Sequence, residues 1–196
     1  MDLQKINIKL PVKGGGELPL KAFIPIFNAW IQASDGYYYD LADYSHMPTG
    51  PGLVLVADEA NFSLDQTDKQ LGLLYNRKRP MKGSNGEKLL SAFRSALQNC
   101  RRLEDEPALG GRFKFWSNEA LVFINDRLRA PNTEDTFRTV KPELEKLGQI
   151  LYGGAEFAVQ KENDLKRRFG VRLKTAAFFE AGTLLENIES AGGSVQ

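Results

Sequence analysis

The chain has 196 residues, of which 42% are hydrophobic and 26% are charged, and its formal net charge is +1. These are ordinary globular values, so they exclude wholesale disorder and the strongly basic composition of a dedicated nucleic-acid-binding protein. The longest apolar runs are strand-sized, and the first ten residues lack the pattern of a secretory signal, so we expect a cytoplasmic protein with no membrane segment.

The first third of the chain predicts three strands and one helix. Residues 5–10 alternate apolar and polar side chains, which indicates a strand, and 37–42 and 53–57 predict two more. Because 53–57 (LVLVA) is apolar on both faces, we expect it to be a central strand. Apolar residues at helical spacing predict a helix over 19–33, with Pro25 at a kink or in its true first turn. The glycines of 12–19 indicate a flexible connection rather than a phosphate-binding loop.

The middle of the chain reads as two similar segments, 72–116 and 120–160. Each has an apolar strand, a capping residue, a helix, a double glycine and a second strand at its end. A capping box from Ser84 to Glu87 begins the first helix, which runs to about Leu103, and Asn132 or Thr133 caps the second. Tandem βαβ units of this kind are the ferredoxin-like pattern, and 5–42 is read as a more divergent third copy.

The last segment predicts a strand at 171–176, a helix at 178–188 and a frayed tail at 190–196. No low-complexity linker divides the chain, so we expect a single domain over 1–196. The predicted class is α+β, with helices packed on a mixed, largely antiparallel sheet built from tandem βαβ units, ferredoxin-like in residues 72–160.

One cysteine and one histidine limit the available chemistry. They exclude an internal disulfide framework and the usual multi-Cys/His zinc site. Cys100 shares helical spacing with apolar neighbours, so we predict a buried core thiol rather than a nucleophile. The sequence contains no cofactor-binding motif, and we predict neither a metal nor a cofactor.

The single histidine, His46, lies in a proline- and glycine-rich turn between the strands at 37–42 and 53–57. The end of this connection, GPGL, suits a type II turn in which Gly52 supplies a positive φ. The connection is too short for a parallel crossover, so the strands should form an antiparallel hairpin. In a hairpin His46 and Asp43 lie at one end, while Asp58 and Glu59 leave at the other, roughly 16 Å away. A shared site for all four is therefore rejected. Asp43, Tyr44 and His46 remain the catalytic candidates, and a purely structural turn is the preferred interpretation.

Two further segments are candidates for binding. Tyr37 and Tyr39 point to one side of a strand, and tyrosine is enriched both in strands and at interfaces. The segment YNRKRPMK places basic residues beside a tyrosine at a strand end, where they could contact phosphates or an acidic protein. Its candidate residues are Tyr75, Arg77, Lys78, Arg79 and Lys82.

Three functions are compatible with these features. The first is a non-enzymatic interaction or assembly protein that acts through the Tyr-rich strand, a sheet edge and the basic loop. The alternative is a small-molecule enzyme that uses Asp43 and His46 as an acid–base pair, and the third is nucleic-acid binding through 77–82. Partners are therefore expected to be another protein or a second copy of the chain, with nucleic acid disfavoured and no membrane.

The C-terminal helix is the reason to expect self-association. Phe178, Ala181, Leu185 and Ile188 form one apolar stripe, which must cover either the chain's own sheet or a second subunit. The strands at 5–10 and 171–176 come from opposite ends of the chain, and we expect at least one of them at an open sheet edge.

Overall fold

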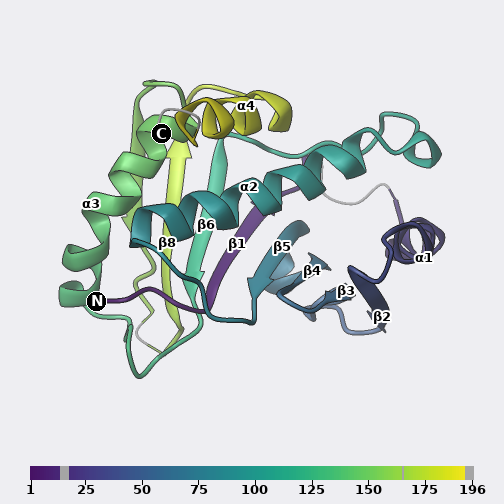
Figure 1. Cartoon of the computed structure of the whole chain (residues 1–196), viewed down its shortest axis with the longest axis horizontal. Helices are drawn as coiled ribbons and strands as arrows, with labels where there is room; N and C mark the ends of the chain where they lie inside the picture. The colour runs from purple at the N-terminus through teal and green to yellow at the C-terminus, as the bar shows by residue number, and fades with distance from the viewer. Residues whose placement is uncertain (14–17, 165, 193–196) are drawn as a thin grey trace.

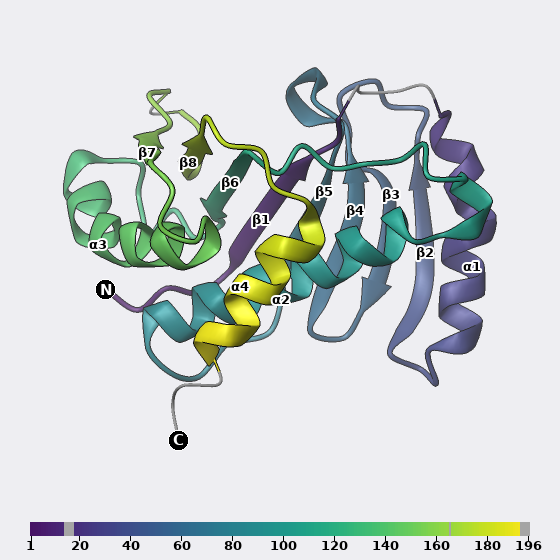
Figure 2. The same cartoon turned by 90° about the horizontal axis from the view of Figure 1, so that it is seen from above.

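The computed structural model describes residues 1–13, 18–164 and 166–192, and over these it contains one sheet of eight strands and four α-helices. The strands are β1 (Ile6–Pro11), β2 (Tyr38–Tyr44), β3 (Gly52–Ala57), β4 (Ala60–Asp65), β5 (Gly72–Arg77), β6 (Glu119–Ile124), β7 (Phe157–Lys161) and β8 (Phe169–Thr175). The helices are α1 (Ile24–Ala33), α2 (Asn85–Glu104), α3 (Glu134–Leu151) and α4 (Ala181–Gly192). Helices α2 and α4 cross the same face of the sheet, and α1 lies beside β2 at one end of it (Figure 1, Figure 2).

The strand order is β2-β3-β4-β5-β1-β6-β8-β7, and every neighbouring pair is antiparallel. The α+β class is therefore confirmed, but the expected mixed sheet is wrong. The tandem βαβ pattern is not confirmed either. The second strand expected for the first unit, at 112–116, does not form, and α2 instead leads to β6, the strand that begins the second unit.

Local sequence signals set the helix boundaries. Ser84 caps α2, and its side chain accepts a hydrogen bond from the N–H of Glu87 while the Glu87 side chain bonds back to Ser84, which completes the predicted capping box. Thr133 caps α3. Pro25 lies in the first turn of α1, where its missing N–H has no partner to lose. Residues 20–23 form a separate 3₁₀ turn before it.

Several predictions about the strands are wrong. Residues 112–116 form no strand and contribute only an isolated bridge between Phe115 and Val12. The prediction omits strand β4, although ANFSLD alternates apolar and polar side chains as a strand does. Strand β3 is next to an edge rather than central. The edges are β2 and β7, whereas β1 is an interior strand and β8 is second from the end, so neither terminal strand is open for pairing.

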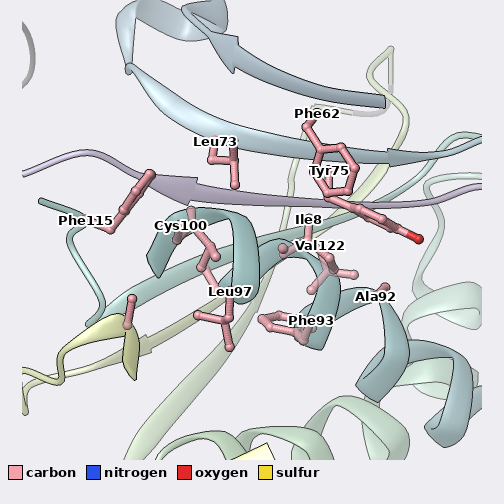
Figure 3. Close-up of a cluster of buried hydrophobic side chains, with 14 of the residues drawn as sticks. Ile8, Phe62, Leu73, Tyr75, Ala92, Phe93, Leu97, Cys100, Phe115 and Val122 are labelled. Atoms are coloured by element: carbon pink, nitrogen blue, oxygen red, sulfur yellow. The ribbon is translucent and has the colours of Figure 1, made fainter. Parts of the chain in front are cut away.

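The core lies between the sheet and α2. Ala92, Phe93, Leu97 and Cys100 of α2 are buried, and they belong to the same hydrophobic cluster as strand residues such as Ile8 of β1 and Val122 of β6 (Figure 3). Cys100 is a free, fully buried thiol, and burial raises its pKa, as expected of a core residue.

The apolar side of α4 is covered within the chain. Ala181, Leu184, Leu185 and Ile188 are buried, and α4 packs on α2 and α3. Phe178 precedes the helix and is half exposed, so it is not part of the stripe. The helix therefore no longer argues for a second subunit.

Two other predictions fall partly outside the described residues. The predicted flexible connection includes 14–17, and the predicted frayed tail includes 193–196, which lie outside the described residues, while 190–192 continue α4. Within the described residues, no helix combines the length and the apolar character required to cross a membrane.

Candidate functional site

The histidine turn is an exposed end of the β2–β3 hairpin. The hairpin is antiparallel, with Tyr44 opposite Gly52 and Tyr38 opposite Ala57, as predicted from the short connection. Asp43, Tyr44 and His46 are all exposed. The Asp43 carboxylate accepts a hydrogen bond from the Ser45 N–H at 2.8 Å. Hydrogen bonding from the Ser45 side chain, and then from this N–H, lowers the Asp43 pKa. Asp43 thus closes the turn through Ser45 instead of holding the imidazole.

At the other end of β2, segments far apart in the sequence meet on one surface. Lys78, which follows β5, places Nζ 3.3 Å from the hydroxyl of Tyr39 and 5.7 Å from the centre of its ring. The Tyr39 side chain is 54% exposed. Strands β3 and β4 lie between β2 and β5 in the sheet. The contact between Lys78 and Tyr39 therefore depends on the tertiary structure, and the linear sequence does not predict it.

The two arginines of this segment are paired with carboxylates of the β3–β4 turn. Arg77 Nη1 lies 2.6 Å from Glu59 Oε2, and Arg79 Nη2 lies 2.8 Å from Asp58 Oδ1. The hydrogen bond from Arg79 lowers the pKa of Asp58. Arg77 also donates to the carbonyl oxygens of Arg79 and Pro80, and its side chain is only 12% exposed, so its position is fixed.

Tyr37 belongs to the same surface, whereas Tyr75 does not. Tyr37 is half exposed, and its pKa is raised first by burial and then by the nearby Glu59. Tyr75 is 2% exposed and packs edge-to-face on Phe62, so it is a core residue. Lys82 is exposed on the segment that leads to α2.

We call the resulting patch the Tyr–Arg surface. It comprises Tyr37, Tyr39, Arg77, Lys78 and Arg79, together with Asp58 and Glu59. Two of its three cations, Arg77 and Arg79, pair with its two carboxylates at hydrogen-bond distance, so it is a mixed-charge surface rather than a free basic cluster. It includes the start of edge strand β2, where a register shift between Tyr38 and Asp40 interrupts the ladder.

A second polar region lies on the sheet face opposite α2, and the sequence does not predict it. Lys9 of β1 and Asp65 of β4 form a buried ion pair there, beside a cavity of about 330 Å³. The alternation in KINIKL predicts that Lys9 turns away from the core. It gives no sign that loops from distant parts of the chain cover the side chain, so burial on both faces could not be foreseen.

The described residues contain no group of three or more His, Cys, Asp or Glu side chains able to hold a metal ion. No protein-family model matches the chain, and comparisons with curated proteins and with solved structures find no match.

Proposed function

We propose that the protein is a non-enzymatic interaction protein that binds another protein, or a second copy of itself, through the Tyr–Arg surface. The observation that supports this most directly is the contact between Tyr39 and Lys78 beside the paired arginines. It joins residues from both segments that the sequence marks as binding candidates.

The chemistry of the surface suits a protein partner. Tyrosine and arginine are enriched among the residues that dominate binding energy. A tyrosine buries a large area with few rotatable bonds and keeps a polar end, and the planar guanidinium of an arginine presents several donors in a fixed geometry. Arg77 is already immobilised by Glu59 and two carbonyl groups, so its guanidinium group would lose little conformational freedom on binding a partner.

The paired charges disfavour nucleic acid as the partner. A phosphate backbone would have to compete with Asp58 and Glu59 for the two arginines, and the carboxylates would repel it. A protein surface with its own acidic and basic groups can instead match both signs. Cys100 is a free thiol, which fits a reducing compartment, and the proposal includes the cytoplasm as its location.

The proposal is tested by affinity capture from native cell extract, with the captured proteins quantified by mass spectrometry. The test variant is Tyr39→Ser combined with Lys78→Ser, which removes the central contact of the surface. Tyr44→Ser is the matched control, because Tyr44 is 42% exposed at the opposite end of the same strand.

We expect the control to retain a stoichiometric partner that the double variant loses. Light scattering of the isolated protein tests for self-association. In that case the wild type and the control should have a mass above that of the 21.9 kDa monomer, and the double variant should not. Equal capture by both variants, or a monomer with no captured partner, would contradict the proposal.

A further inference from the structure

The sheet face opposite α2 carries a cavity. Different parts of the chain form its floor and its walls. Its volume is about 330 Å³, within the range of small-molecule sites. Lys9 of β1 and Leu121 of β6, which are register partners, form part of the floor with Phe123. The walls are the β4–β5 turn, residues 65–70, and the β7–β8 connection, whose lining residues are Glu162 and 166–168.

An ion-pair network joins the two walls across the cavity. Arg167 of the β7–β8 connection pairs with Asp68 of the β4–β5 turn, and its Nη1 lies 3.1 Å from Glu162 Oε2. The cavity is thus held together by contacts between segments 99 positions apart in the sequence.

The most buried charges of the cavity balance each other. Lys9 Nζ lies 2.5 Å from Asp65 Oδ1 and also donates to the carbonyl oxygen of Thr67 at 3.0 Å. The Asp65 carboxylate accepts two further hydrogen bonds from Thr67, at 3.1 and 2.8 Å. The charge of each group is therefore compensated within the chain.

Arg168 differs from them, because among the described residues it has no carboxylate partner. Its guanidinium lies over the Phe123 ring, 4.3 Å from the ring centre. With the Asn7 amide oriented to satisfy its neighbours, the amide oxygen accepts from Arg168 Nη1 at 2.9 Å. Burial lowers the Arg168 pKa, and Arg167 acts in the same direction. The remaining donors of its fork have no protein acceptor in the described residues.

The whole lining has an excess of positive charge. Five basic and three acidic side chains surround the cavity, a net charge of +2. Lys9 and Arg167 account for the three carboxylates. Arg127, Lys166 and Arg168 remain without a carboxylate partner among the described residues, although Arg127 donates to the Lys166 carbonyl oxygen.

From this geometry we infer that the cavity binds the phosphate group of a small phosphorylated molecule, with the Arg168 fork as its main ligand and Lys166 and Arg127 at the rim. A phosphomonoester carries about −1.5 to −2 charge at neutral pH, which matches the excess charge of the lining. A planar guanidinium that lies over an aromatic ring keeps N–H groups in the fork geometry that bonds phosphate bidentately. Leu121 supplies an apolar floor for the organic part of the ligand.

The test is a titration of the full chain with inorganic phosphate, up to about 20 mM at constant ionic strength, followed by backbone amide chemical shifts. We expect saturable shifts at residues 65–70, 121–127, 162 and 166–168. Arg168→Gln should weaken binding about tenfold, as removal of a charge-assisted bidentate contact does. Arg138→Gln, at an exposed arginine on α3, should bind as the wild type does.

Should Arg168→Gln fail to fold, Lys166→Gln combined with Arg127→Gln is the second variant, since both side chains are exposed. It should weaken binding about threefold to tenfold. Three results would overturn the inference: no saturable shift in the wild type, equal affinity of the cavity variants and Arg138→Gln, or tighter binding of succinate than of phosphate.

Discussion

Lys9 of β1 and Asp65 of β4 lie 56 positions apart in the sequence, yet their side chains meet at 2.5 Å and are only 6% and 4% exposed. Burial removes both charges from water, so each depends on the other for compensation. The pair anchors the β4–β5 turn to an interior strand through Thr67, and it thereby fixes one wall of the cavity.

We expect Lys9→Met to lower the free energy of unfolding by about 3–5 kcal/mol, because it leaves the Asp65 carboxylate buried without a cation. Denaturant unfolding measures this loss. The double variant Lys9→Met/Asp65→Leu should recover most of it, since no charge then remains buried. A single variant as stable as the wild type would show that water reaches Asp65.

Gly52 is predicted to be irreplaceable at the start of β3. Its φ is +64°, as the predicted turn at GPGL requires, and a Cβ there would lie 2.0 Å from the carbonyl oxygen of Leu64. Gly52→Ala should therefore cost about 3 kcal/mol or more of unfolding free energy. Gly111→Ala is the control, because its φ is +72° but a Cβ would meet nothing within 4 Å. It should cost about 1–2 kcal/mol from the backbone alone, and equal losses would argue against the clash.

Glu104 should make stability depend on pH. Its side chain is 8% exposed and accepts the Phe115 N–H at 2.9 Å, and burial raises its pKa above the ordinary 4.5. A raised carboxyl pKa means that the folded state binds the proton more tightly, so the stabilising contribution is complete below 4.5 and is lost as pH rises through the folded value.

Glu104→Gln keeps an uncharged acceptor at every pH. The difference in unfolding free energy between this variant and the wild type should therefore grow in favour of the variant as pH rises above 4.5. Urea unfolding at several pH values measures it, with Glu186→Gln on the exposed side of α4 as the comparison. A difference that stays constant with pH would rule out the burial effect.

His46 is expected to be dispensable. The side chain is exposed, and Ser45 rather than the imidazole engages Asp43. His46→Gln should change the unfolding free energy by about 0.5 kcal/mol or less and leave partner capture unchanged. A normally folded variant that loses its function would instead support the acid–base enzyme built on Asp43 and His46.

The local features of this protein follow from short stretches of its sequence. The capping box at Ser84, the helical spacing around Cys100 and the turn chemistry at Pro25 and Gly52 each depend on residues a few positions apart, and the structure contains all four. The antiparallel β2–β3 hairpin followed from the length of its connection.

The order of the strands in the sheet, by contrast, depends on contacts between distant segments. Strand β1 is inserted between β5 and β6, and β8 between β6 and β7, because pairing joins backbones without regard to sequence distance. The same long-range pairing brings Tyr39 to Lys78, Lys9 to Asp65, and Arg168 onto Phe123. Alternation along a strand specifies the face on which a side chain lies. What covers that face is decided by the packing of distant loops, and for this reason the cavity could not be read from the sequence.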